Sequence, residues 1–100
     1  MNIIPLDRRD DIYFQAHRRG LTVALDTDSS DVHRTRYNIG GSPVVAYIRA
    51  LYFTESRKWE ARACGHDAFI IRDSIAIADT AEDAAARSLA LALPIQEETT

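Results

Sequence analysis

The chain has 100 residues, of which 46% are hydrophobic and 27% are charged. This length and composition favour a single domain, residues 1–100, with one core. No apolar run approaches the roughly 18 to 20 residues of a membrane span, and the first residues lack the pattern of a secretory signal. Cys64 is the only cysteine. A single cysteine excludes an internal disulfide, and we expect the protein to be located in a reducing cytoplasm.

Charge is distributed unevenly along the chain. The formal net charge is −3, and residues 67–100 contain seven acidic residues against Arg72 and Arg87, a net charge of −5. Residues 1–66 therefore carry +2. Eleven of the twelve basic residues are arginines, whose planar side chains bind carboxylates and phosphates through paired hydrogen bonds. The sequence thus predicts an acidic domain with two poles of opposite charge.

A first helix is predicted over about residues 8–19. Asp7 can cap its start, because a short acidic side chain accepts hydrogen bonds from the free N–H groups of the first turn. Gly20 followed by Leu21 is typical of a Schellman motif, which ends a helix at a glycine.

Two strands are predicted next. Residues 21–25 are short and partly β-branched, and a polar loop follows at 26–31. Residues 32–39 alternate between two sets of side chains but are polar for a strand. We therefore expect them to form an edge strand that pairs back across the acidic loop.

Residues 44–53 could form a strand or a helix. Ser42 and Pro43 would suit the first positions of a helix, whereas the segment VVAYIRALYF is β-branched and aromatic. We predict a strand, because a polar turn leads from it into residues 58–64, which alternate strictly. The pair would form a hairpin. Its second strand would place Trp59, Ala61 and Ala63 on the core side and Lys58, Glu60 and Arg62 on the water side.

Further strand is expected at residues 68–71 and 74–78, after a turn at 65–67. The order of elements predicts an α+β fold, a small antiparallel sheet of four to five strands with an N-terminal and a C-terminal helix packed on it. The last residues, 95–100, are expected to form a frayed tail.

The C-terminal helix is predicted over residues 79–93. Either Asp79 with Glu82 or Thr80 with Asp83 fits a capping box at its start. Its inner face is small and consists of Ala81, Ala84, Ala85, Ser88, Leu89 and Ala92. A helix lined mainly with alanine must lie close to its partner, so we expect an aromatic-rich sheet to supply the larger side chains.

Sequence signatures of enzymes are absent, since the chain has no G-x-S-x-G, H-E-x-x-H, P-loop or G-x-G-x-x-G pattern. Residues 64–67 combine cysteine, histidine and aspartate, but a zinc site usually needs four ligands in paired spacings. We interpret this segment as a turn, and residues 40–42 as a structural turn rather than a phosphate loop. The expectation is a protein without catalytic residues, metal or cofactor.

The candidate binding residues are charged. Carboxylates in the polar loop and at the start of the last helix could imitate a phosphate backbone toward an arginine-rich partner. A basic set at residues 17–19 and 33–36 could meet phosphates or an acidic protein. The residues proposed for binding are Asp26, Asp28, Asp31, Arg34, Arg36, Glu82 and Asp83.

Residues 52–91 resemble the plant APETALA-type DNA-binding domain. In that family a K-W-x-A strand is followed by another strand and by a T-A-E-x-A-A helix. The matching segments here are KWEA at 58–61 and TAEDAA at 80–85. The resemblance implies that Lys58, Trp59 and Arg62 contact DNA.

A compact, acidic chain of this size without enzyme motifs is also similar to the small proteins that phages and mobile elements encode to block host machinery, among which anti-CRISPR proteins are a large class. This resemblance implies a non-enzymatic inhibitor in the host cytoplasm whose protein partner is a nucleic-acid-binding complex such as a CRISPR effector. Two alternatives stay open. One is a small nucleic-acid-binding domain, against which the net charge of −3 argues; the other is an immunity protein that neutralises a toxin.

Overall fold

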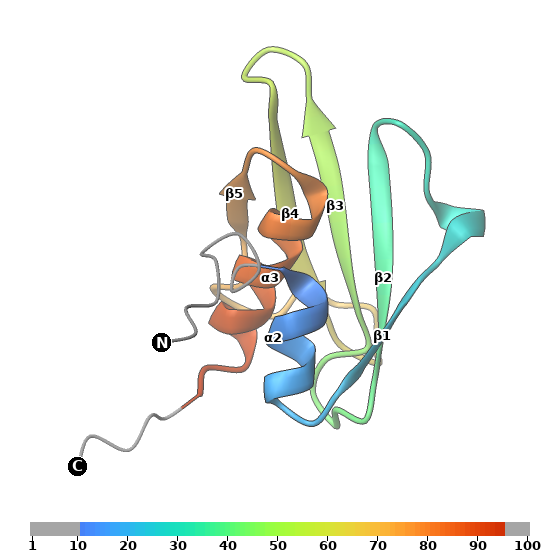
Figure 1. Cartoon of the computed structure of the whole chain (residues 1–100), viewed down its shortest axis with the longest axis vertical. Helices are drawn as coiled ribbons and strands as arrows, with labels where there is room; N and C mark the ends of the chain where they lie inside the picture. Colours follow the sequence, from blue (N-terminus) through green and yellow to red (C-terminus); the bar gives the residue numbers. More distant parts are fainter. Residues whose placement is uncertain (1–10, 96–100) are drawn as a thin grey trace, which may run out of the picture.

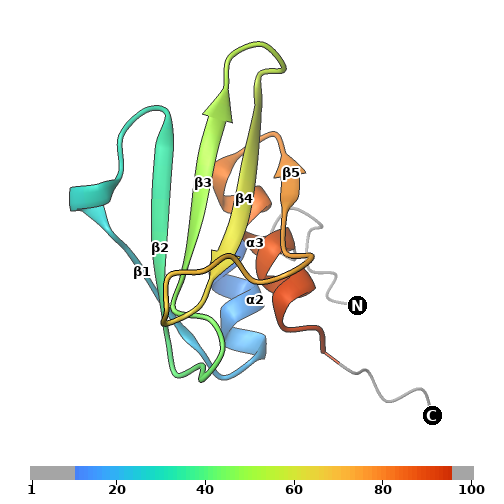
Figure 2. The same cartoon turned by 180° about the vertical axis from the view of Figure 1, so that it is seen from behind.

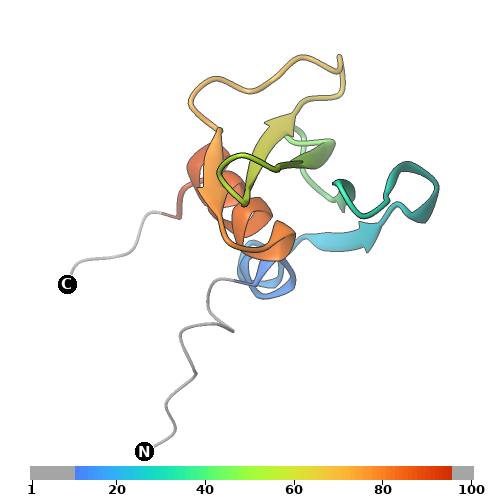
Figure 3. The ribbon, with the colours of Figure 1, turned by 90° about the horizontal axis from the view of Figure 1, so that it is seen from above.

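A computed structural model describes residues 11–95 as a five-stranded antiparallel sheet with two helices. Both helices lie on the same side of the sheet (Figures 1 and 3). The predicted α+β class, with one N-terminal and one C-terminal helix on an antiparallel sheet, is confirmed. Residues 96–100, predicted as a frayed tail, lie outside the described residues. The elements are α2 (Ile12–Arg18), β1 (Thr22–Leu25), the 3₁₀ helix η1 (Thr27–Ser29), β2 (Arg34–Gly40), β3 (Tyr47–Phe53), β4 (Lys58–Cys64), β5 (Ala76–Ala78) and α3 (Ala81–Ala92).

Both ends of α2 are capped by local sequence. The carboxylate of Asp11 accepts a backbone N–H of the first turn at 2.7 Å, whereas Asp7, the cap expected from the sequence, lies outside the described residues. At the other end Gly20 has a φ of 71°, and the N–H of Leu21 donates to the carbonyl oxygen of Ala16 at 2.9 Å. This is the predicted Schellman motif.

β2 lies between β1 and β3 and is not an edge strand, so the sequence-based expectation was wrong on this point. The expectation failed because the arginines and the asparagine of this strand lie on one side of it. Arg34, Arg36 and Asn38 project to the side of the sheet without helices, and Tyr37 and Ile39 are buried on the other side. The polarity of this strand reflects an uncovered face of the sheet rather than an unpaired edge.

Residues 44–53 contain the predicted strand β3 and no helix. The ambiguity has a physical origin in the turn before the strand. There the hydroxyl of Ser42 accepts hydrogen bonds from the N–H groups of Val44 and Val45 at 3.1 and 3.0 Å. These are the contacts of a helix cap, made in a turn that leads into a strand. β3 and β4 form the predicted hairpin, and its tip projects beyond both helices (Figure 1).

The segment between β4 and β5 contains less strand than the sequence indicated. Residues 68–71 and 74–78 were expected to be extended, but β5 is the only strand there. Ala68 and Asp73 have φ values of 69° and 61°, a left-handed conformation that a strand cannot contain. The segment instead forms a long loop that crosses one end of β3 and β4, on the side away from the helices (Figure 2).

Thr80 caps α3, since its hydroxyl accepts the N–H of Asp83 at 3.1 Å. The structure therefore selects one of the two caps that the sequence allowed. Arg87 of α3 donates a hydrogen bond to the carbonyl oxygen of Ile77 at 2.8 Å. This bond links the helix to the strand that precedes it.

The contact between α3 and the sheet joins small side chains to small side chains. Ala84, Ala85 and Ser88 are fully buried on the helix. The strands beneath α3 present five buried alanines, Ala50, Ala61, Ala63, Ala76 and Ala78. The expected aromatic-rich surface opposite this helix is not found. Because the side chains on both sides are small, the helix packs close to the sheet instead. Larger side chains flank the contact: Ile12, Ile48 and Leu89 are fully buried, and Trp59 is partly buried against Tyr52.

Candidate functional site

Figure 2 views the side of the sheet without helices, here called the open face. The strand registers place basic and aromatic residues on it. Strand alternation and the pairing register place on it Arg34, Arg36 and Asn38 of β2, Tyr47, Arg49, Leu51 and Phe53 of β3, Lys58, Glu60 and Arg62 of β4, and Ile77 of β5. Cations outnumber the single carboxylate of Glu60. The same strands are apolar on the helix side, so one sheet has two chemically different faces.

Three arginines, here called the arginine row, lie next to one another across the middle of the open face. Arg36 on β2 pairs with Arg49 on β3, and Arg49 pairs with Arg62 on β4. Residues directly opposite in antiparallel strands have Cα atoms only about 4.5 to 5.5 Å apart. Like charges in such positions destabilise a sheet. The row therefore carries an electrostatic cost to folding that a bound anion would relieve.

Two members of the row have carboxylate partners. Arg62 Nη2 lies 2.7 Å from a carboxylate oxygen of Glu60, and Arg36 Nε lies 3.6 Å from one of Asp26. The guanidinium of Arg36 also lies 3.8 Å from the centroid of the Tyr47 ring, in a cation–π contact. Arg62 Nε is buried and has no hydrogen-bond partner among the described residues. Both guanidinium groups are held in place while part of their donor capacity is unused.

Arg49, the central member of the row, is exposed. Its side chain forms no hydrogen bond or ion pair with any residue between 11 and 95. Its guanidinium can therefore offer all five N–H donors to a ligand, and it lies between two neighbours of the same charge. Among the open-face cations it is the one most available to an incoming phosphate or carboxylate.

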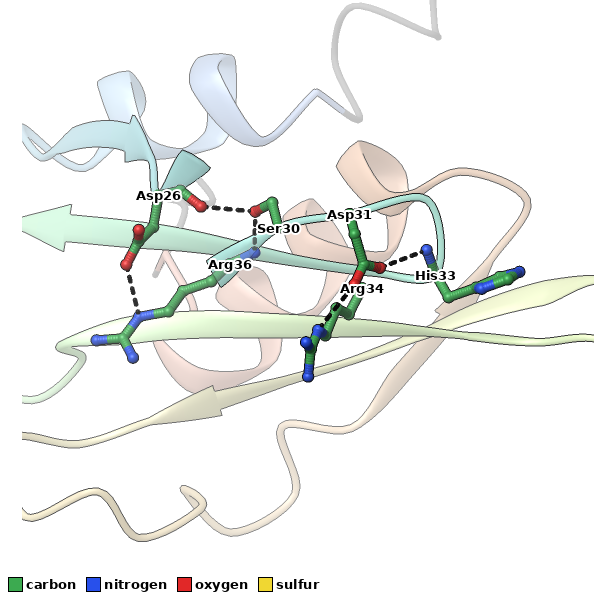
Figure 4. A network of polar contacts seen from close by, with 6 residues as sticks. All are labelled: Asp26, Ser30, Asp31, His33, Arg34 and Arg36. Carbon is green, nitrogen blue, oxygen red and sulfur yellow. Dashed lines mark hydrogen bonds and ion pairs between the residues drawn. The ribbon is translucent and has the colours of Figure 1, made fainter. Parts of the chain in front are cut away.

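The loop that leads into β2 brings several sequence-predicted residues together (Figure 4). Asp31 lies 3.1 Å from Arg34 Nε, and Asp26 forms the ion pair with Arg36. Ser30 Oγ accepts the N–H of Arg36 at 3.1 Å and donates to the carbonyl oxygen of Asp26 at 2.7 Å. The carboxylates of this loop thus offset the arginines beside them, which makes them less suited to imitate a row of free phosphates.

The charge of Asp31 should stabilise the native state. Its carboxylate accepts the N–H of His33 at 2.8 Å, and this hydrogen bond, together with the charge of Arg34, holds the pKa of Asp31 below its usual range. A lowered native pKa contributes stability that is fully present above the unfolded-state pKa of about 3.9 and is lost as pH falls through the native pKa.

We therefore expect Asp31→Asn to lower the melting temperature at neutral pH and to have no effect in strong acid, where both side chains are neutral. Thermal unfolding of the two proteins from about pH 2 to pH 7 measures the difference. A difference that persists unchanged at the acid end would show that the charge of Asp31 is not its cause.

Glu82 and Asp83 lie in the first turn of α3, on the helix side of the sheet, and not with the loop acids. Burial raises the pKa of Glu82, and the negative charges of Asp11 and Asp83 raise it further. The structure thus divides the sequence-predicted acids between two places. Asp11, Glu82 and Asp83 form a group of their own at the N-terminal ends of the two helices, here called the acidic cluster.

Two hollows adjoin the open face. The first is a cleft of about 300 Å³, lined in part by Asp28, Arg34, Arg36, Tyr47, Arg49 and Leu51. The second, of about 460 Å³, lies at the free end of the β3–β4 hairpin, lined in part by Tyr52, Phe53, Lys58, Trp59 and Ile77. The cleft is mainly cationic. The hairpin hollow contains three aromatic side chains together with Lys58, Glu55 and Glu60. An anionic group and a flat ring could therefore bind next to each other.

Arg49 and Tyr47 were not among the residues proposed from the sequence. The available signal was a single charged residue, Arg49, that interrupts the apolar run at 44–53. Of the residues implicated by the APETALA-type resemblance, Lys58 and Arg62 lie on the open face and Trp59 lies on the helix side.

Other candidate chemistry is limited in the described part of the chain. Cys64 is buried, and the Nε2 of His66 lies 3.1 Å from the carbonyl oxygen of Ser42. Between residues 11 and 95 no group of three His, Cys, Asp or Glu side chains could hold a metal ion. Neither α2 nor α3 has the length and apolar character needed to cross a membrane.

A small antiparallel sheet with two helices supports many unrelated functions, so function has to be inferred from the chemistry of the open face. That face combines an arginine row, an adjacent cleft and an aromatic hollow. Comparisons with protein-family models, with curated proteins and with solved structures found no match to this chain.

Proposed function

We propose that this protein acts by binding nucleic acid on its open face. The observation that supports the proposal is the arginine row, in which Arg36, Arg49 and Arg62 occupy opposite positions on three neighbouring strands. Guanidinium groups bind phosphates through paired hydrogen bonds. Neutralising phosphates also releases counterions, which supplies much of the affinity of proteins for nucleic acids. A phosphate backbone would thus relieve the like-charge repulsion within the sheet.

The net charge of −3 is compatible with this function because the charges are separated in space. The acidic cluster lies across the sheet from the open face, and at physiological salt charges further apart than about 8 Å are largely screened. The pair between Arg34 and Asp31 is solvent-exposed, with side-chain exposures of 63% and 50%. Exposed pairs of this kind contribute little to stability, so phosphates can displace the carboxylate.

Arg49→Gln should weaken binding without weakening the fold. Removing one phosphate contact is expected to lower the affinity for a labelled 12-nucleotide strand about tenfold at low salt. It should also reduce the slope of log K against log salt by about 0.7. Fluorescence anisotropy at several salt concentrations measures both quantities.

Arg18→Gln is the matched control, because it removes the same charge from α2 on the helix side. Its affinity and salt slope should equal those of the wild type. Equal losses in the two variants would show that net charge, and not the open face, determines binding. Absence of binding by the wild-type protein at low salt would contradict the proposed function.

The acidic cluster supports a second candidate function, that of an inhibitor which binds a nucleic-acid-handling complex, such as an anti-CRISPR protein. Grouped carboxylates can occupy an arginine-rich site that otherwise holds phosphates. Size-exclusion chromatography with purified CRISPR effectors tests this function. It predicts a complex that Glu82→Lys with Asp83→Lys abolishes and Arg49→Gln preserves. The reverse pattern, or no complex with any effector, would refute it.

A further inference from the structure

We infer that the open face binds single-stranded rather than duplex nucleic acid, an inference that rests on the proposed function. The first argument is the width of the sheet. The arginine row spans β2, β3 and β4, and β1 and β5 extend the sheet on either side. Four strand spacings of about 4.8 Å give a width of about 19 Å. The major groove of DNA is only about 12 Å wide and admits a helix or a two-stranded ribbon.

The projecting tip of the β3–β4 hairpin is narrow enough to enter a groove, but it lacks the arginine row (Figure 1). Its turn carries Glu55 together with Arg57. A duplex that accepted this tip would leave Arg36 on β2 outside the groove, because that residue lies two strands away from β4. Insertion of the hairpin tip into a groove would therefore leave the arginine row without contacts to the duplex.

The second argument is the aromatic hollow next to the row. Phe53 is 45% exposed and lines this hollow with Tyr52 and Trp59. It lies four residues along β3 from Arg49, a distance of about 13 Å. Proteins that bind single strands place phosphates on cations and stack the free bases on aromatic rings. The paired bases of a duplex cannot reach such a hollow, whereas an unpaired base can.

The third argument is the arrangement of charge along β3, between the cationic cleft and the hairpin hollow. The cleft holds Arg34, Arg36 and Arg49 at one end, and Lys58 lies beside the hollow at the other. Leu51 lies between them on β3. A strand laid along β3 on the open face would therefore meet cations at both ends, the apolar side chain of Leu51 between them and the ring of Phe53 at the hairpin. Single-stranded RNA and single-stranded DNA share this chemistry, and both are suitable ligands.

The test compares labelled 12-nucleotide oligo(dT) and oligo(U) with a 12-base-pair DNA duplex and an RNA duplex of the same length, by fluorescence anisotropy at one salt concentration. We expect at least one single strand to bind about tenfold or more tightly than either duplex. Preference for oligo(U) or for oligo(dT) then identifies RNA or DNA as the ligand. A duplex that binds as tightly as the single strands would overturn this inference and leave the proposed function intact. Failure of all four probes would overturn both.

A pair of phenylalanines provides the matched variants. Phe53→Ala should reduce single-strand affinity by about 5- to 150-fold, the effect of losing one stacked base. Phe69→Ala removes the same ring from the loop outside the hollow, where it is 73% exposed, and should bind like the wild type. Circular dichroism melting verifies that both variants are folded. Wild-type affinity in Phe53→Ala, or an equal loss in Phe69→Ala, would overturn the inference.

Discussion

Replacing Ile48 with alanine should lower the free energy of unfolding by about 2 to 5 kcal/mol. Ile48 lies in β3, the central strand, and is completely buried. Its cross-strand neighbours are Tyr37 and Ala63, and the alanines close to α3 are too small to fill the cavity that the substitution leaves. A loss of this size is a large share of the roughly 5 to 15 kcal/mol by which small domains are stable. Urea unfolding followed by the fluorescence of Trp59 measures it.

Ile77→Ala is the control for this prediction. Ile77 has the same side chain but lies on the open face, where it is 55% exposed. Its truncation should change the free energy of unfolding by less than about 1 kcal/mol. Similar losses in the two variants would contradict the assignment of one covered and one uncovered face to this sheet.

The second large effect concerns Arg49→Glu, which should stabilise the protein and abolish binding. In the wild type Arg49 faces a like charge on each side, Arg36 and Arg62. The substitution turns both contacts into pairs of opposite charge, each worth about 0.2 to 1 kcal/mol. For a domain of this size the melting temperature should rise by about 2 to 16 °C. The same change puts a carboxylate where a phosphate would bind, and affinity for a 12-nucleotide strand should fall about a hundredfold or more.

A gain in stability together with a loss of affinity would indicate that the arginine row serves binding and not the stability of the fold. A residue that only supports the fold would lose stability together with binding. Arg18→Glu, which reverses a charge on α2, should reduce affinity only through the change in net charge. A lower melting temperature in Arg49→Glu would contradict the repulsion between Arg49 and its two neighbours that the strand register implies.

Local elements were predicted correctly where short-range chemistry determines them. The Gly20–Leu21 pair ends α2 through a Schellman motif, the strict alternation at residues 58–64 forms β4, and Thr80 caps α3. Each of these signals acts within a few residues. Prediction failed at residues 68–71, where the positive φ of Ala68 interrupts an apolar run that has the composition of a strand.

The candidate site was only partly predictable. The sequence indicated Arg34 and Arg36 but missed Arg49, although the hairpin contained the necessary signal. A turn centred on residues 54–57 places Arg49 opposite Arg62, because the turn sets the register of a hairpin. The pairing of Arg36 with Arg49 depends on how β2 joins that hairpin, and no short pattern specifies it.

Short patterns of residues predicted most helices and strands and the polar side of each strand, because capping, turns and alternation act over a few residues. Arg36, Arg49 and Arg62 are separated by thirteen residues in each step, and they form one row because the pairing of β2, β3 and β4 brings them together. The tertiary structure also decided that the loop acids lie beside arginines while Glu82 and Asp83 lie beyond the sheet. Strand order and the side on which the helices pack depend on burying the apolar faces together. Burial of the apolar faces involves the whole chain. Because both helices pack on the apolar side of the sheet, the basic side is left without helices.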